Sequence, residues 1–250
     1  MITTAVRGAG YALTGFRLVF RPRLRRFVVI PLMVNVALFV AGGFLLVGWI
    51  GQLSDALVAW LPDWLDWLSY LLWVVFLLIF IGLMLFGFTA LANLIGAPFN
   101  SVLAERCALL LGGPPSESAR PLWAEVVTAL QGELHKWGYY LVRALPLALL
   151  TFIPGIGLFA SLALLLLTTW MLGLGYLDYP LGNAGLAFRQ QRKLLARRRT
   201  LVLGFGAAVF VLTLIPFVNF FVMPAAVCGA TRLWLSEQAE FVTRGVDPAV

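Results

Sequence analysis

Charged residues are scarce in this sequence. Asp, Glu, Lys and Arg together make up 12% of the 250 residues, whereas hydrophobic residues make up 62%. The surface of a water-soluble domain is largely polar, and charged residues usually supply about a quarter of such a chain. The scarcity of charge therefore excludes a soluble domain and predicts an integral membrane protein.

Residues that carry catalytic or metal chemistry are also few. The chain has one histidine, His135, and two cysteines, Cys107 and Cys228. It shows no metal-ligand spacing, no pair of catalytic carboxylates, no phosphate-loop motif and no nucleophile with a neighbouring base. We therefore predict that the protein is not an enzyme and uses no metal ion or cofactor. We expect the cysteines to be reduced thiols and His135 to be an ordinary interface residue.

Basic residues are absent from residues 27–97, although the chain has 18 of them. Residues 27–51 and 69–97 carry no charge at all, and at about 1.5 Å per residue each is long enough to cross a hydrocarbon core of roughly 30 Å. Residues 52–68 between them contain three aspartates, with tryptophans at helical spacing, which is typical of an interfacial segment. The positive-inside rule then predicts that residues 52–68 are periplasmic and that both termini are cytoplasmic.

Two apolar stretches in the C-terminal half are each interrupted by proline. The motif Thr-x-Ile-Pro occurs at Thr151–Pro154 and again at Thr213–Pro216. Because proline ends helices, we predict two helical hairpins, residues 137–175 and 201–230. The turns are uncharged and the arms of the second hairpin are shorter than a bilayer, so we expect at least one re-entrant hairpin. The first hairpin is also long enough to cross the membrane twice.

These features predict an all-α integral membrane protein with two long transmembrane helices, two helical hairpins, at least one of them re-entrant (hemi-penetrating), and interfacial helices. We expect a single membrane domain, residues 1–250. Its remaining segments are an interfacial helix and arginine cluster in residues 1–26, cytoplasmic residues 98–136, the basic cytoplasmic connector 176–200 and the cytoplasmic tail 231–250. The N-terminal helix is expected to face the membrane through Val6, Ala9, Leu13, Phe16 and Phe20. A further helix is expected to begin after Pro98, capped by Asn100 or Ser101.

Four arginines precede the first long apolar run, in the segment Arg21-Pro-Arg-Leu-Arg-Arg-Phe27. A helix is expected to begin directly after Arg25 and Arg26. The first N–H groups of a helix lack internal partners and carry the positive end of its dipole. Arginines beside such groups favour the binding of a tetrahedral oxyanion. The residues themselves leave two interpretations open, an anchor that sets the topology and an anion site.

Charges elsewhere also allow more than one interpretation. Arg143, about two turns into the first hairpin, either extends back to the cytoplasmic interface, pairs with a buried carboxylate or faces an aqueous path. Glu105 and Arg106 point about 100° apart on a helix, which leaves pairing across subunits open. The basic segment 189–199 is expected to contact anionic lipid and to set orientation. It lacks the interleaved aromatic residues of a nucleic-acid site, so no nucleic-acid partner is expected.

Five segments resemble the CysZ family of bacterial sulfate permeases, and the resemblance extends over nearly the whole chain. The segments are GAPFNSVLAE (96–105), YLDYPLGN (176–183), IPFVNFF (215–221), MPAAVCGAT (223–231) and RRFVVIPLMVN (25–35). The resemblance implies a multi-pass homo-oligomer of the bacterial inner membrane, surrounded by membrane lipid. It implies that this oligomer admits sulfate, or the related sulfite, for cysteine synthesis.

The resemblance also implies which residues hold the anion. Sulfate would be bound by Arg25 and Arg26 together with the N–H groups near Phe27 and Val28. A polar network near the cytoplasmic end of the path would include the positions of two further residues, Glu105 and Arg106. We add Arg143 as a candidate for the wall of the route.

The chain departs from the family at one place. Family members often carry Asp-Asn-His where this chain has Gly182-Asn183-Ala184, so proton coupling through that acid or imidazole is not expected here. Two functions remain open. One is a sulfate permease; the alternative is a non-conducting membrane scaffold or regulatory subunit of another transporter, which has no reason to bind sulfate selectively.

Overall fold

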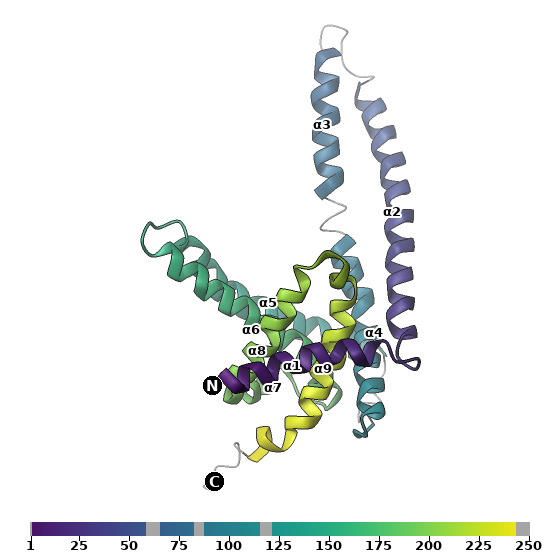
Figure 1. The fold of residues 1–250 in the computed structure, drawn as a ribbon. Helices are drawn as coiled ribbons and strands as arrows, with labels where there is room; N and C mark the ends of the chain where they lie inside the picture. Colours follow the sequence, from purple (N-terminus) through teal and green to yellow (C-terminus); the bar gives the residue numbers. More distant parts are fainter. Residues whose placement is uncertain (1, 59–65, 83–87, 116–121, 244–250) are drawn as a thin grey trace. The chain divides into compact units, whose positions relative to one another are not determined.

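The computed structural model describes residues 2–58, 66–82, 88–115 and 122–243, which are helical apart from short turns and include no strand (Figure 1). The all-α prediction is confirmed for this part of the chain. In chain order the elements are α1 (Ile2–Val19), α2 (Arg26–Val58), α3 (Asp66–Gly82), α4 (Phe88–Leu110), α5 (Leu122–Leu150), α6 (Gly157–Asn183), α7 (Phe188–Leu195), η3 (Ala196–Arg198), α8 (Arg199–Thr213) and α9 (Pro216–Thr243). The chain forms two compact units: the first comprises residues 1–26 and 100–250, the second residues 27–99.

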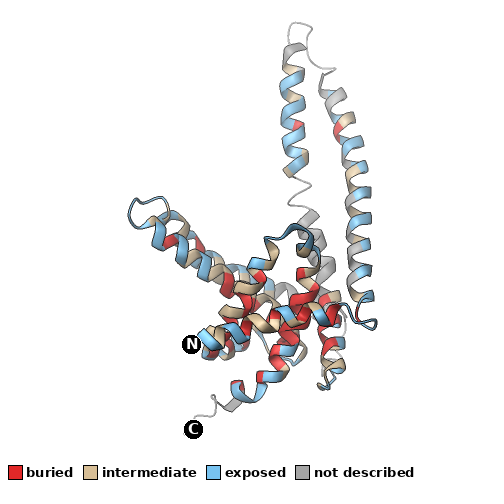
Figure 2. Cartoon of the chain, in the orientation of Figure 1, coloured by how far each residue is buried: buried red, intermediate tan, exposed pale blue. Residues whose placement is uncertain are grey.

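The second unit contains the first predicted span. Residues 27–51 lie within α2, which continues to Val58 and is therefore about 50 Å long. Large apolar side chains such as Phe44 and Trp49 are exposed along it, which is typical of a surface that contacts lipid (Figure 2). Val36–Leu53 is long and apolar enough to cross a membrane.

The second predicted span, residues 69–97, coincides with α3 and the first part of α4. Residues 83–87 between these helices lie outside the described residues. The same holds for residues 59–65 of the predicted periplasmic segment, whose two ends belong to α2 and α3.

The predicted helix start after Pro98 is wrong, because α4 is continuous from Phe88 to Leu110. Proline inside a helix removes one hydrogen bond and costs about 3 kcal/mol. The chain nevertheless has Pro146, Pro180 and Pro224 inside α5, α6 and α9. Neighbouring helices and local adjustments compensate for such prolines in membrane proteins. Proline alone therefore does not end a helix in this protein.

Both predicted hairpins are present in the first unit, and their turns lie at the repeated motif. Thr151 Oγ1 donates a 2.6 Å hydrogen bond to the carbonyl of Ala148. Thr213 Oγ1 does the same to the carbonyl of Phe210, also at 2.6 Å. Each hydroxyl therefore satisfies a carbonyl in the last turn of the helix that precedes the bend. The sequence repeat has a common local structure.

The two hairpins differ from the prediction in length. The arm after the second turn is the 28-residue helix α9, so the prediction of two arms shorter than a bilayer is wrong. Gly157–Asn183 and Pro216–Phe241 are each long and apolar enough to cross a membrane. The hairpin tips are apolar, with Phe152 and Phe217 each 84% exposed, which favours contact with lipid over water. Whether either hairpin is re-entrant stays a prediction.

The core of the first unit lies where α1, α6, α8 and α9 meet (Figure 2). α1 crosses α8 and α9 through small residues. A Cβ on Gly8 would collide with the backbone of α8 at Leu201, and one on Gly15 would collide with the backbone of α9 at Ala225. Such close approach through glycine is typical of helices packed in membranes.

The apolar face predicted for the N-terminal helix is not the face that packs. Val6, Leu13 and Phe20 on it are exposed, whereas Gly8 and Gly15 are buried. Leu18 and Val19 are buried with these small residues, while Val6, Leu13 and Phe20 remain on the surface. Such a surface is compatible with the predicted interfacial position.

The two cysteines are joined in a disulfide. Cys107 of α4 and Cys228 of α9 have a Cα–Cα distance of 5.7 Å although they lie 121 residues apart in the chain. The prediction of two reduced thiols is therefore wrong. Their separation in the sequence gave no indication that α4 and α9 bring them into contact.

Candidate functional site

The arginine turn, residues 21–26, is built around one buried leucine. The N–H groups of Leu24 and Arg25 both donate to the carbonyl of Arg21, at 2.9 and 3.1 Å. Leu24 is only 1% exposed and fixes the turn to the first unit. All four arginines of the turn are exposed. The turn therefore presents four guanidinium groups outward from a closed backbone.

The predicted anion-binding pair stands where the sequence placed it relative to the helix. Arg25 is the last residue of the turn and Arg26 is the first residue of α2. Phe27 and Val28 follow in the first turn of this helix. The two units divide between Arg26 and Phe27. That these residues bind an anion stays a prediction.

Two of the family-like segments meet in the first unit and bond to each other. Ser101 Oγ of α4 donates to Asn183 Oδ1 of α6 at 2.7 Å, and Asn183 Nδ2 donates to the carbonyl of Ser101 at 2.9 Å. One turn earlier on α6, the hydroxyl of Tyr179 accepts a 3.3 Å hydrogen bond from Asn100 Nδ2. Asn100 and Ser101 were predicted to cap a helix. Instead they hold α4 to α6.

A partly buried lysine adds charge to the same region. Lys136 Nζ of α5 lies 2.6 Å from Glu133 Oε1 and 2.5 Å from Asp178 Oδ2 of α6. Burial alone lowers the pKa of Lys136, but the carboxylates of Asp178 and Glu133 outweigh it and raise the pKa above its usual value. Lys136 is therefore charged at neutral pH. Sequence reasoning missed this group, although Glu133 and Lys136 have the i,i+3 spacing of a helical ion pair.

Glu105 and Arg106, the predicted members of a polar network, are not part of this cluster. Glu105 is half-buried and Arg106 is exposed on α4. Neither forms an ion pair or hydrogen bond through its side chain with any residue that the structure describes. Their pairing across subunits stays a prediction.

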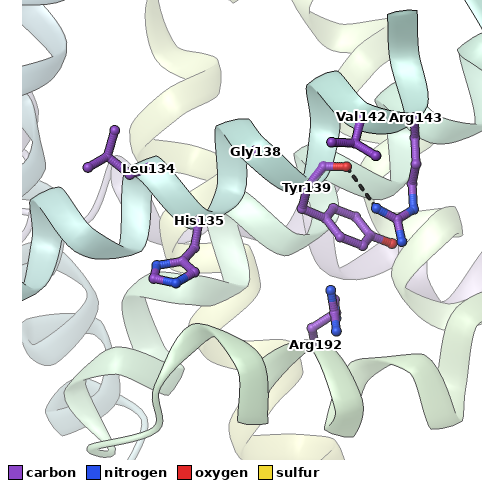
Figure 3. A pocket seen from close by; sticks show the side chains of 7 residues that line it. All are labelled: Leu134, His135, Gly138, Tyr139, Val142, Arg143 and Arg192. Carbon is purple, nitrogen blue, oxygen red and sulfur yellow. Dashed lines mark hydrogen bonds between the residues drawn. The ribbon is translucent and has the colours of Figure 1, made fainter. Parts of the chain in front are cut away.

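Arg143 lines an open hollow of about 420 Å³ between α5 and α7 (Figure 3). Its Nη1 donates a 3.0 Å hydrogen bond to the carbonyl of Tyr139, one turn back towards the predicted cytoplasmic end of α5. The guanidinium carbon lies 3.9 Å from the centre of the Tyr139 ring. No described carboxylate pairs with it, which removes the buried-carboxylate interpretation within the described chain.

The hollow also brings together residues that sequence reasoning kept apart. Arg192 of α7 approaches the same tyrosine ring, with its guanidinium carbon 4.9 Å from the ring centre. His135 lines the hollow one turn before Tyr139. Arg192 was assigned to the lipid-contacting basic segment and His135 to an ordinary interface. Their proximity depends on how α7 folds back against α5, for which the sequence has no local signal.

A protein-family model matches residues 11–224, which is most of the chain. The description of that family is "Sulfate transporter CysZ/Etoposide-induced protein 2.4". The matched range includes the arginine turn, the Ser101–Asn183 contact and the hollow beside Tyr139. The resemblance found in the quoted segments is confirmed.

Proposed function

Because the chain belongs to the family of the sulfate transporter CysZ and etoposide-induced protein 2.4, we propose that it is a sulfate permease of the bacterial inner membrane, which admits sulfate for assimilation into cysteine. The described helices include three that are long and apolar enough to cross a membrane. The observation that carries the proposal beyond family membership is the arginine turn, with four exposed guanidinium groups directly before α2. In this proposal passage needs neither a chemical reaction nor a cofactor.

Arg25 and Arg26 would capture the dianion. Guanidinium groups make charge-assisted, often bidentate hydrogen bonds to tetrahedral oxyanions, and the first N–H groups of α2, at Phe27 and Val28, add the positive end of a helix dipole. Binding of this kind must stay modest, because conduction requires release as well as capture. The buried Leu24 keeps the turn in place while the arginines remain exposed.

A homo-oligomer would complete the route through the membrane. Glu105 and Arg106 have no side-chain partner among the described residues of one chain, and pairing between subunits would provide one. Buried or membrane-level charges usually have a partner or face water. Arg143 would stand on the wall of the same polar route. Surrounding lipid would contact the exposed apolar surfaces of the hairpins.

The alternative function is a scaffold or regulatory subunit that conducts nothing. The exposed apolar tips and the disulfide-linked helices would serve such a protein equally well. The two functions differ in anion affinity, because a scaffold has no reason to prefer sulfate to chloride. Sulfate binding and sulfate flux therefore decide between them.

The decisive experiment measures sulfate binding and flux into proteoliposomes for the unaltered chain and for Arg25→Ala/Arg26→Ala. The matched control is Arg21→Ala/Arg23→Ala, which removes two exposed arginines from the same turn. Sixteen other Lys and Arg residues remain in each variant, so the positive-inside rule predicts unchanged orientation. We expect sulfate flux to be lost and sulfate binding to be weakened in Arg25→Ala/Arg26→Ala, and both to be retained in the control.

Each other outcome has a definite meaning. If binding is lost but flux persists, the arginine turn is an exit or regulatory site and does not lie on the import path. If both double variants behave like the unaltered chain, the arginines are topology anchors. Absence of sulfate flux and of sulfate preference in the unaltered chain would favour the scaffold.

A further inference from the structure

The hollow beside Tyr139 combines two positive groups on one aromatic ring. Arg143 comes from α5 and Arg192 from α7, and their guanidinium carbons lie 3.9 and 4.9 Å from the ring centre. Figure 3 shows both side chains next to the tyrosine, with His135 on the same side of α5. Cation–π contacts position the two guanidinium groups, but they do not neutralise them.

The carboxylates that form ion pairs in the described chain do so with other basic residues. The ion pairs join three basic residues to four carboxylates: Arg7, Arg198 and Lys136 to Glu133, Asp178, Glu237 and Glu240. None of them includes Arg143 or Arg192. Two guanidinium groups on one ring repel each other when no negative group is present, and an anion between them would convert this repulsion into attraction.

The surroundings of the hollow indicate where the anion comes from. On α5 the exposed apolar residues Leu141, Val142 and Leu145 lie beside Arg143. On α7 the neighbouring Arg189 and Lys193 are exposed and basic. A change from an apolar to a basic surface is typical of the level of lipid headgroups, where arginines extend from hydrocarbon towards phosphate.

We propose that Arg143 and Arg192 form a second oxyanion site, which binds the tetrahedral oxyanion of an anionic lipid headgroup or of free sulfate. The hollow of about 420 Å³ has the size of a small-ligand site and is open to the surface. Each guanidinium fork can hold two oxygens of such a group. Tyr139 keeps the two forks on the same ligand. This site is defined by binding, so it does not rest on the proposed permease function.

The test uses the full chain purified in detergent, with Arg25→Ala/Arg26→Ala in every sample so that the arginine turn cannot contribute. Into this background we introduce Arg143→Gln/Arg192→Gln. The matched control is Arg17→Gln/Arg232→Gln, which removes two exposed charges, from α1 and α9, that do not line the hollow. Melting temperature is titrated with sodium sulfate, against sodium chloride at equal ionic strength, and with short-chain phosphatidylglycerol, against short-chain phosphatidylcholine.

A ligand that binds the folded protein raises its melting temperature, and the rise increases with the ratio of free ligand concentration to Kd. We expect Arg143→Gln/Arg192→Gln to weaken the affinity at least about tenfold, since each lost charged hydrogen bond is worth more than one such factor, and the control to leave it unchanged. A shift with phosphatidylglycerol alone assigns the site to lipid, and a shift with sulfate alone assigns it to the free anion.

Sulfate also stabilises proteins without binding to a site, by exclusion from their surface. Equal shifts in the hollow variant and the matched control would therefore overturn the proposal, as would no shift with either ligand. If Arg143→Gln/Arg192→Gln does not fold, Arg143→Lys/Arg192→Lys decides. It keeps the charge but loses the planar fork, so undiminished affinity in that variant would contradict bidentate binding. Failure of the permease proposal leaves all these outcomes unaffected, because Arg25 and Arg26 are absent from every sample.

Discussion

The first unit contains two arginine clusters that differ in whether they include carboxylates. In the Glu237 cluster, Arg7 of α1 and Arg198 of η3 both pair with Glu237 of α9, and Arg198 also lies 2.9 Å from Glu240. Tyr11 donates a 2.8 Å hydrogen bond to the same glutamate. Burial, with the neighbouring carboxylate of Glu237, raises the pKa of Tyr11, so its hydroxyl remains a donor.

The Tyr139 cluster, formed by Tyr139, Arg143 and Arg192, also contains two arginines, but no described carboxylate forms an ion pair with them. The side chains of Arg198 and Glu237 are only 5% and 3% exposed, whereas the Tyr139 cluster opens to the surface. An arginine whose charge is balanced inside the protein holds helices together. One that is not balanced can accept an external anion. Counter-charge and burial therefore distinguish the two roles.

The largest effect is expected from breaking the Glu237 cluster. Glu237→Ala leaves the buried guanidinium of Arg198 without its main partner, and removal of one member of a buried ion pair costs about 3–5 kcal/mol. This cost is measured as the decrease in the free energy of unfolding in detergent–lipid micelles.

The matched control is Glu240→Ala, because Glu240 is 50% exposed and contacts the same arginines. Solvent screening limits its effect to about 1 kcal/mol or less. Similar losses in both variants would contradict a structural role specific to Glu237.

A smaller effect is expected from displacing α1, which contributes Arg7 and Tyr11 to the Glu237 cluster. In Gly15→Ala the new Cβ collides with the backbone of α9 at Ala225, and overpacking of this kind costs about 1–3 kcal/mol. The control is Gly10→Ala on the same helix, where no atom lies within 4 Å of the added Cβ.

The two glycine variants should differ in sign. Alanine favours a helix over glycine by about 0.5–1 kcal/mol, so Gly10→Ala is expected to stabilise the protein. Thermal unfolding of the two variants side by side gives the comparison. Equal melting temperatures would mean that α1 does not depend on close contact at Gly15.

A third variant would make the Tyr139 cluster resemble the Glu237 cluster. Tyr139→Glu supplies an internal carboxylate one turn before Arg143 and next to Arg192, in the favourable i,i+4 orientation. The anion affinity of the hollow should fall at least about tenfold, because the added carboxylate satisfies both arginines. Stability should change by about 1 kcal/mol or less, since the site is open to solvent.

Tyr139→Gln is the control for Tyr139→Glu, because it removes the ring without adding charge. It should retain more anion affinity than the glutamate variant. Titration of melting temperature with sulfate and phosphatidylglycerol measures both. If Tyr139→Gln weakens binding as much as Tyr139→Glu does, loss of the ring alone explains the effect. The lack of an internal carboxylate would then not be the reason that the site binds an external anion.

Local patterns in the sequence predicted the elements well. The uncharged run before residue 51 became α2, and both Thr-x-Ile-Pro motifs became turns with the same threonine hydrogen bond. In each case the signal lies within a few residues of the structure it specifies. One local rule that failed is the helix break at Pro98, because α4 is continuous through it.

Contacts between distant segments were not predictable in the same way. Cys107 meets Cys228, Ser101 meets Asn183, and Arg192 joins Arg143 only because the helices pack as they do. Residue types and spacings do not encode such pairings in a single sequence. The candidate site was therefore predicted as isolated arginines. Which of them have internal counter-charges became evident only from the packed helices.

Lys136 lies between the two clusters in character, and it should have the smallest effect. Its side chain is 12% exposed and shares the carboxylates of Glu133 and Asp178. The pKa of Lys136 is lowered by burial but raised on balance by these carboxylates.

A basic group whose pKa is higher in the folded state than in the unfolded state stabilises the fold. This stabilisation is fully present below the unfolded-state pKa of 10.5 and is lost as the pH rises through the folded-state pKa. We therefore expect the free energy of unfolding of the unaltered chain to exceed that of Lys136→Gln by about 1 kcal/mol near neutral pH. This difference should fall above pH 10.5 and disappear once the pH has passed the raised pKa of the folded state. Lys136→Arg should remain more stable than Lys136→Gln over the same pH range, because arginine remains charged there. The comparison is made by measuring the unfolding free energies of the three proteins from pH 8 upwards, through the ordinary pKa range of lysine. A difference that persists unchanged in the lysine protein would mean that packing of its methylene chain, and not its charge, stabilises α5 against α6.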